Sequence, residues 1–349
     1  MKLPQNILVF RTDRLGDVLM CLPALGMLRE TFPEAELGFV CRKDHHPVLK
    51  GLLDSWGVAL FSPENYSQLE AFQKHQPDAV LFLQAEREVV YAAFRAGVST
   101  RVGLRSKWWS FLFLTHGLRQ KRSRSEKNEA EYNLDLAGEL ARLSKREPRA
   151  KPPITLPLQA ESKAKAELAL KKVEIDVSLP FLVLHPGMGG SALNLSASHY
   201  AEIVKKLSAV FPVVVTIGPA PGDQDLKNLL HSQIPFLKTV ENIEIGTLAE
   251  IFRLASRVIA PSTGPLHLAH YVGASTLGLF SPVRTHHPAR WGPFGGTGDS
   301  VSLLPRVFCP ATVACRGPRC PQYACMEQTD WAQLILEAVG TGASVDFNG

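Results

Sequence analysis

Two stretches of sequence decide the fold. Asn6-Ile-Leu-Val-Phe10 runs into the loop Arg11-Thr-Asp-Arg-Leu-Gly-Asp17, and Phe181-Leu-Val-Leu-His185 runs into the loop Pro186-Gly-Met-Gly-Gly-Ser191. In both stretches a short apolar run is followed by a polar loop and then by a helical pattern. Short apolar runs that alternate with helix-length segments are typical of parallel βαβ units. The sequence therefore predicts two α/β halves, each opening on a buried strand.

The same alternation continues through both halves. Further strands are expected at 37–41, 78–83, 100–104, 213–218, 257–260 and 275–280. Helices are expected at 17–30, 89–96, 129–143, 160–173, 198–210, 222–230, 247–255, 265–273 and 329–339. Between the halves, the three prolines of Lys151–Pro157 exclude a regular helix.

This pattern predicts an α/β protein of two facing Rossmann-like domains with parallel sheets and an interdomain cleft. Residues 1–155 form the N-terminal domain and residues 156–328 the C-terminal domain. A final helix and tail, residues 329–349, is expected to pack back toward the N-terminal domain. Ligands of such sheets bind where the carboxyl ends of the strands collect their loops.

Composition narrows the class of protein. The 349 residues are 45% hydrophobic and 20% charged, with a mean hydropathy of zero, which excludes a disordered or fibrous chain. No apolar run is long enough to span a membrane, and the N-terminus has no signal-peptide layout, so we expect a cytoplasmic protein. A net charge of +5 is too small for a nucleic-acid groove, and no nucleic-acid partner is expected.

The loop after the first strand carries a candidate acid. Gly16 directly before Asp17 permits a tight turn that presents a carboxylate at the mouth of the sheet. Asp17 is equally well explained as a helix-capping acid, since carboxylates favour the positive end of the helix dipole. The loop matches neither a P-loop nor a G-x-G-x-x-G pattern, which disfavours a nucleoside triphosphatase and a dehydrogenase.

Two loops of the second half resemble anion sites. The glycines around Gly189 and Gly190 let backbone N–H groups converge on an oxyanion, and Ser191 adds a hydroxyl. The second loop, Ser262-Thr263-Gly264, opens a helix, and His267 on its first turn can reach the same anion. Two such cradles in one domain fit a diphosphate better than a single phosphate.

Five segments together resemble a known family. They are Arg14–Leu25, His185–Ser191, Ser262–Ala269, Gly278–Pro282 and Ala289–Pro293, in this order. Their combination is similar to the lipopolysaccharide heptosyltransferases of glycosyltransferase family 9, over nearly the whole chain. The resemblance implies a GT-B fold and inverting transfer of heptose from ADP-L-glycero-β-D-manno-heptose to the lipopolysaccharide inner core.

The same resemblance implies roles for individual residues. Asp17 would be the general base, and the donor diphosphate would lie against two groups of residues, Gly189, Gly190 and Ser191 in one loop and Ser262, Thr263, Gly264 and His267 in the other. Asp223, after Ile217-Gly-Pro219, is a candidate for the donor ribose hydroxyls or simply a helix cap. Charge on the departing nucleotide would be stabilised by preset donors, so no metal and no further cofactor is obligatory.

The acceptor of such a transfer, a Kdo- or heptose-bearing lipid A, is anionic. Its carboxylate and phosphates would meet guanidinium groups, which bind oxyanions in bidentate fashion. The candidates are Arg14, Arg101, Arg105 and Arg122, the last of them in the basic run 119–127, which is otherwise a solvated surface. Beside them, Trp108-Trp109 and Phe111-Leu-Phe113 form an apolar stretch that indicates either core packing or peripheral contact with the inner membrane.

Some features keep alternatives open. Leu193 stands where family members often carry a basic residue, which leaves a transferase of another nucleotide sugar and a non-catalytic nucleotide- or glycan-binding homologue as alternatives. A periplasmic-type binding protein would need an export signal. The thiols of Cys309, Cys315, Cys320 and Cys325 are expected to stay reduced, with a metal site or a disulfide as the other possibilities.

Overall fold

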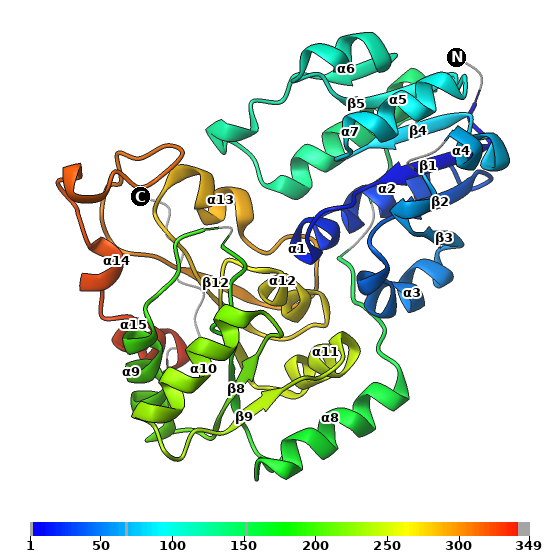
Figure 1. Ribbon diagram of the computed structural model, residues 1–349. Helices are drawn as coiled ribbons and strands as arrows, with labels where there is room; N and C mark the ends of the chain where they lie inside the picture. The colour runs from blue at the N-terminus through cyan, green and yellow to red at the C-terminus, as the bar shows by residue number, and fades with distance from the viewer. Residues whose placement is uncertain (1–2, 67–68, 151–152, 191, 341–349) are drawn as a thin grey trace. The chain divides into compact units, whose positions relative to one another are not determined.

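The computed structural model describes residues 3–66, 69–150, 153–190 and 192–340 (Figure 1). The chain divides into two compact units. The first comprises Met1–Arg122 and Glu129–Pro157, and the second comprises Ser123–Asn128 and Leu158–Gly349. The division thus falls two residues after the predicted boundary at 155, and a short segment before Glu129 belongs with the second unit.

The first unit is built on a sheet of six strands in the described part of the chain, in the order β3-β2-β1-β4-β5-β6. Every pairing within it is parallel. The central strands β1 and β4 are buried along almost their whole length, as expected when helices cover both faces of a sheet. The strands are β1 (Asn6–Phe10), β2 (Glu36–Val40), β3 (Val58–Phe61), β4 (Ala79–Phe82), β5 (Thr100–Leu104) and β6 (His116–Leu118).

The second unit repeats this plan. Its sheet, again of six strands among the described residues, has the order β12-β11-β10-β7-β8-β9 and is parallel throughout. The strands are β7 (Leu182–Leu184), β8 (Val213–Ile217), β9 (Thr239–Glu241), β10 (Arg257–Pro261), β11 (Thr276–Leu279) and β12 (Ser300–Leu303). Counted from the first strand of each unit, both sheets have the order 3-2-1-4-5-6 of the doubly wound dinucleotide-binding fold.

Helices connect the strands of each sheet (Figure 1). Those of the first unit are α1 (Leu15–Leu19), α2 (Leu22–Thr31), α3 (His46–Ser55), α4 (Leu69–His75), α5 (Arg87–Arg95), α6 (Trp108–Phe113) and α7 (Glu129–Leu143). Those of the second are α8 (Ala160–Lys172), α9 (Ala197–Ser208), α10 (Pro221–Gln233), α11 (Ile245–Leu254), α12 (Gly264–Tyr271), α13 (Pro288–Trp291), α14 (Cys325–Gln328) and α15 (Trp331–Gly340).

The helix after β1 differs from its prediction. One helix was expected over 17–30, but the structure has α1 and α2, which are separated at Met20–Cys21. Pro23 lies in the first turn of α2, a position that tolerates proline because no N–H is needed there. The side-chain amide of Asn133, from α7, donates to the carbonyl oxygen of Met20 at 3.1 Å. It thus supplies a hydrogen bond to a backbone acceptor at the point where the helix is interrupted.

The last helix also differs from its prediction. We expected residues 329–349 to pack toward the N-terminal domain, but α15 packs against α9 and contributes Trp331, Ile335 and Ala338 to the core of the second unit. Trp331 is fully buried, and its indole N–H donates to the carbonyl oxygen of Met326 at 2.8 Å. The helix also contacts β12, and its apolar face belongs to the core cluster that includes apolar side chains of β7 and β8. Residues 341–349 lie outside the described residues.

The packing of α15 makes a testable prediction. Trp331→Ala should lower the unfolding free energy of the second unit by about 3–5 kcal/mol, because a buried indole is lost and a cavity remains. Hydrogen exchange of the backbone amides should then accelerate in β7 and β8 and stay unchanged in β1 and β4. Val210→Ala, at a largely exposed position of the second unit, is the matched control and should change neither set. Faster exchange in β1 and β4 instead would contradict the observed packing.

Candidate active site

The strand order places the loops that matter. In each sheet the chain turns back beside its first strand, so the loops after β1 and β4, and those after β7 and β10, leave neighbouring strands in opposite directions. A crevice forms at such a point, outside the carboxyl ends of the strands. The predicted loops Arg11–Asp17, Pro186–Ser191 and Ser262–Gly264 all follow these strands.

Arg11 is the centre of a buried ion cluster in the first unit. It follows β1 directly, and its side chain is almost fully buried. Its Nη2 lies 2.6 Å from Oδ1 of Asp17, its Nε 2.7 Å from Oδ1 of Asp13, and its Nη1 3.4 Å from Oε1 of Glu129. One guanidinium therefore binds three carboxylates and fixes the orientation of Asp17, which itself is part-exposed on the short helix α1.

Glu129 ties this cluster to a distant segment. It begins α7, is 1% exposed, and also binds Nη1 of Arg122. The Nε and Nη2 of Arg122 donate to Oε1 of Gln120 at 2.9 and 2.8 Å. Arg122 was predicted to contact the acceptor, but much of its hydrogen-bonding capacity is used inside this cluster.

The cluster shifts the acidity of its members. Burial raises the pKa of Asp17 to about 6, because loss of water disfavours the carboxylate; Arg11 opposes this rise, whereas Asp13 and Glu129 add to it. Burial alone would lower the pKa of Arg11, but the surrounding acidic groups raise it, so the guanidinium stays charged. A carboxyl group with a pKa near 6 is both a usable base and a usable acid close to neutral pH.

The first loop of the second unit lies against Asp223. This residue is on the first turn of α10, and a methyl group added to Gly187 would come within 2.7 Å of its Oδ1. A methyl group added to Gly218, after β8, would come closer still to the other carboxylate oxygen of Asp223. The structure thus brings Asp223 beside the glycine loop, as a shared ligand site would require, and burial raises its pKa. Ser191, predicted in the same loop, lies outside the described residues.

The other predicted residues of that loop are a buried histidine and two glycines. His185 is buried, and its Nδ1 lies 2.9 Å from the hydroxyl of Thr216. Burial lowers the pKa of His185 to about 4, which keeps the ring neutral. Gly190 has a φ of 72°, a left-handed conformation that side chains disfavour, and Gly189 precedes it at an exposed position.

The third predicted loop opens α12. Ser262 is buried and continues the sheet, since its N–H donates to the carbonyl oxygen of Leu279 at 3.2 Å. Thr263 is the extended N-cap residue of α12, and Gly264 is the first helical residue. His267 lies on the first turn, buried, and its Nδ1 has no hydrogen-bond partner among the described atoms. Burial, with a smaller effect of His270, lowers the pKa of His267 to about 3, so its ring is neutral.

The predicted acceptor arginines fall into different settings. Arg14 is exposed and precedes α1, close in sequence to Asp17. Arg101 is buried; its Nε donates to the carbonyl oxygen of Phe113 at 2.6 Å, and its Nη1 donates to that of Val98. Arg105 donates to the carbonyl oxygen of Thr115 at 2.8 Å. Arg101 and Arg105 therefore hold the segment that carries α6, and the structure does not gather the four arginines into one group.

The late cysteines are free thiols. Burial raises the pKa of Cys325, and the nearby Cys309, Cys315 and Cys320 add to the rise. Within the described ranges, no group of three or more His, Cys, Asp or Glu side chains is arranged to hold a metal ion. The metal-free reaction expected from the sequence stays a prediction. No helix of those ranges is both long and apolar enough to cross a bilayer.

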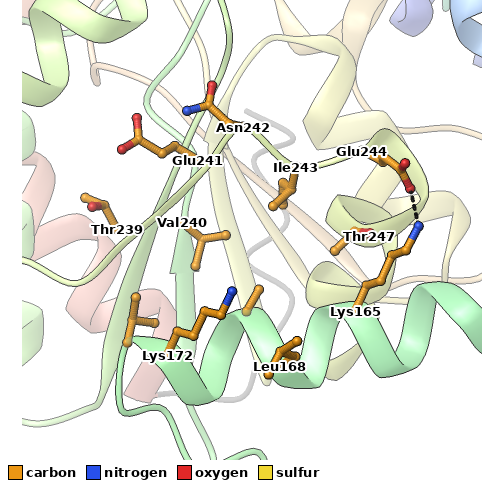
Figure 2. A pocket seen from close by; sticks show the side chains of 12 residues that line it. Lys165, Leu168, Lys172, Thr239, Val240, Glu241, Asn242, Ile243, Glu244 and Thr247 are labelled. Carbon is orange, nitrogen blue, oxygen red and sulfur yellow. Dashed lines mark hydrogen bonds and ion pairs between the residues drawn. The ribbon is translucent and has the colours of Figure 1, made fainter.

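A separate pocket lies at the edge of the second sheet. Figure 2 shows this cavity of about 420 Å³, lined by α8, β9 and the start of α11. Three of the charged groups at its rim are paired: Nζ of Lys165 lies 2.9 Å from Glu244, and Glu241 is bound by Lys227 at 2.6 Å. None of the predicted site residues lines it, so the candidate site stays at the strand ends.

Two units built on this strand order, joined in one chain, are the architecture of the GT-B class of glycosyltransferases. The model of glycosyltransferase family 9 (heptosyltransferase) matches residues 67–306, and the chain belongs to this family. An unconfirmed glycosyltransferase of Haemophilus influenzae is 27% identical over 317 residues, which cover 86% of this chain and 89% of the relative. The chain is a glycosyltransferase, as the sequence predicted.

Solved structures show the same fold. A family 9 glycosyltransferase from Veillonella parvula aligns with a TM-score of 0.70 and 17% identity over 87% of both chains. The E. coli ADP-heptose lipopolysaccharide heptosyltransferase II aligns with a TM-score of 0.68, and E. coli heptosyltransferase WaaC with ADP with 0.65. Both are 17% identical to this chain and cover 97% of it and 100% of their own length. These likenesses confirm the predicted GT-B fold.

The ion cluster makes a prediction about titration. The carboxyl carbon of Asp17, followed by ¹³C NMR, should titrate near pH 6, and Asp13→Asn should lower that pKa because one neighbouring negative charge is removed. Since the ordinary value is 3.8, the native state keeps a proton that the unfolded state releases between about pH 4 and 6. The contribution of Asp17 to the unfolding free energy should therefore fall as the pH rises through this window. An Asp17 that titrates at 3.8 or below would contradict the cluster.

Proposed function

We propose that the protein is an inverting heptosyltransferase that moves L-glycero-D-manno-heptose from ADP-heptose to the inner core of a lipopolysaccharide acceptor. The observation that carries the proposal is Asp17, a part-exposed carboxyl group at the carboxyl end of β1, held by Arg11 and with its pKa raised to about 6. Membership of family 9 and the likeness to two E. coli heptosyltransferases support the reaction class.

Asp17 acts as the general base in this proposal. It accepts the proton of the acceptor hydroxyl while that oxygen attacks the anomeric carbon from the face opposite the departing nucleotide. The bond from carbon to the diphosphate breaks, the new glycosidic bond forms, and the configuration inverts. Arg11 keeps the carboxylate oriented, and the carboxylate oxygen that does not bind Arg11 is left to take the proton.

The second unit holds the donor. The N-terminus of α12, with Thr263 and Gly264, supplies a positive helix end for one phosphate, and an oxygen of the ligand would satisfy the orphan Nδ1 of His267. Gly189 and Gly190 supply backbone donors on the other side, and Asp223 accepts from the ribose hydroxyls. Preset donors of this kind stabilise the charge that grows on the leaving diphosphate without reorganisation, and no metal is invoked.

Transfer from another nucleotide sugar is the second candidate function. Leu193, part-buried after the glycine loop, cannot neutralise a phosphate, so this cradle lacks a cation there. Arg284, exposed in the loop after β11, and Arg290, whose guanidinium lies 4.7 Å from the ring of Trp291, are two cations of this unit that follow β11. The nucleotide that the protein binds distinguishes the two candidate functions. The acceptor and the cytoplasmic location expected from the sequence stay predictions.

The donor site is tested by nucleotide binding. Calorimetry with ADP, UDP and GDP should show a preference for ADP, and Thr263→Ala should weaken ADP binding roughly tenfold through loss of a hydrogen bond to a charged group. Thr312→Ala, at an exposed position outside the loops, is the matched control. A preference for UDP or GDP would keep a transferase but exclude ADP-heptose, and absence of nucleotide binding would favour a non-catalytic homologue.

The general base is tested by its pH dependence. Asp17→Asn should reduce kcat by about 10²–10⁴-fold while leaving ADP binding unchanged. In the wild type, kcat/KM should fall as the pH drops below about 6, because the base becomes protonated. Glu129→Gln removes a negative charge that faces Arg11, Asp13 and Asp17. It should therefore shift the fall of kcat/KM roughly half a pH unit lower, because the pKa of Asp17 decreases.

Glu139→Gln is the matched control for that shift, since its partner is Arg142 on the same helix. It should leave the pH at which kcat/KM falls unchanged. If kcat/KM of Asp17→Asn still falls near pH 6, the titration belongs to another group.

A further inference from the structure

The helix α6 lies at the surface of the first unit, and the side chains that it exposes are apolar. In this helix, Trp108-Trp-Ser-Phe-Leu-Phe113, the side chain of Ser110 is buried and those of Trp109 and Phe113 are partly buried. The side chains of Trp108, Phe111 and Leu112, spaced three and four residues apart, remain 67%, 50% and 62% exposed. A surface helix normally carries polar residues on the face that its core does not use.

Helix α5 extends this apolar surface. Tyr91 and Phe94 are each 40% exposed, and their rings lie 5.0 and 5.4 Å from the ring of Phe113. The two helices are in contact, as Figure 1 also shows beside β5. We call the exposed side chains Tyr91, Phe94, Trp108, Phe111 and Leu112 the α5–α6 patch. Contiguous exposed apolar surface of this kind marks a site of interaction.

Cations are distributed across the patch. The guanidinium of Arg87 lies 5.5 Å from the ring of Trp108, that of Arg95 5.9 Å from Tyr91, and that of Arg105 5.8 Å from Phe111. Residues 87–113 contain five basic side chains, of which only Arg101 is buried, and one acidic side chain, Glu88. The patch therefore combines an apolar floor with positive charge, whereas a protein core or an ordinary solvated face has only one of the two.

The segment that carries the patch is held in place. Arg101 donates to the carbonyl oxygens of Phe113 and Val98, and Arg105 to that of Thr115. The hydroxyl of Ser110 donates to the carbonyl oxygen of Lys107 and so closes the first turn of α6. These bonds hold the backbone of α6 and of the segment after it, the backbone from which Trp108 and Leu112 project.

We propose that the α5–α6 patch is a docking surface for an anionic phospholipid bilayer. Indole and phenol rings favour the boundary between headgroups and acyl chains, where arginine can contact lipid phosphates. A six-residue helix is about 9 Å long and cannot cross a hydrocarbon core of about 30 Å, so the patch lies on the bilayer. Each basic group near an acidic membrane adds attraction that salt weakens.

The position of the patch connects it to the site. A small cavity of about 100 Å³ lies under α6 and is lined by Gln84 and Ala85, after β4, and by Ser106, Lys107 and Trp109. A lipid-anchored acceptor would present its sugar here while its chains stay in the bilayer. This connection rests on the proposed function, but lipid binding itself needs neither donor nor acceptor, so the two proposals can fail separately.

Vesicle sedimentation of the full chain tests the docking surface. The protein should bind vesicles of 60% phosphatidylcholine and 40% phosphatidylglycerol, and bind those of pure phosphatidylcholine roughly tenfold less tightly. Raising the salt from about 50 to 500 mM should weaken binding to the anionic vesicles. The triple variant Trp108→Ala, Phe111→Ala, Leu112→Ala should lose at least roughly tenfold in affinity.

The matched control removes three exposed apolar side chains elsewhere. Val210→Ala, Leu229→Ala and Phe236→Ala together alter exposed positions of the second unit and should leave vesicle binding unchanged. Circular dichroism should show both triple variants folded, and both should bind ADP as the wild type does.

Fluorescence quenching tests whether Trp108 enters the lipid. Brominated acyl chains should quench the tryptophan fluorescence of the wild type, and Trp108→Phe should remove most of that quenching. Vesicle binding that the patch variant retains, or no vesicle binding by the wild type, would overturn the proposal. A concentration-dependent dimer that the patch variant abolishes, without vesicle binding, would assign the patch to a second copy of the chain.

Discussion

The reversal of chain direction beside β1 and beside β7 is the constraint on which the rest of this structure depends. Parallel strands carry all their carboxyl ends at one edge, and only where successive connections leave in opposite directions does that edge open into a crevice. The loops of Asp17, Gly187 and Thr263 all begin there. Polar groups can collect at these points because they lie beyond the strand ends, whereas the strands themselves, covered by helices on both faces, are mostly apolar.

Arg11 shows how a buried charge is tolerated at such a point. A guanidinium does not lose its proton, so its burial must be compensated by carboxylates. Three of them surround it, which leaves the cluster with more negative than positive charge. The excess is relieved when Asp17 keeps a proton up to about pH 6. The same arrangement that opposes folding near neutral pH thus poises a carboxyl group for proton transfer.

The arginines of α5, of β5 and of the loop after β5 have different roles from those that their charge alone suggests. Arg101 and Arg105 donate to backbone carbonyl oxygens and thereby hold α6 in place. Arg87 and Arg95 instead lie over aromatic rings at the surface. A basic residue is therefore no measure of anion binding until its hydrogen bonds are known. Here these hydrogen bonds and the surface charges together give an exposed apolar helix surrounded by positive charge.

The sequence by itself determined the alternation of strands and helices, the GT-B class and the loops that open α1 and α12, because these follow from local apolar periodicity, glycine positions and family motifs. It missed the edge strands β3, β6, β9 and β12, whose short runs carry weak periodicity, and it sent α15 to the other domain. Only the tertiary structure showed that Glu129, 118 residues from Arg11, completes the ion cluster. It also showed that Asp223 packs against Gly187. Contacts between distant segments arise from packing, and no local pattern encodes them.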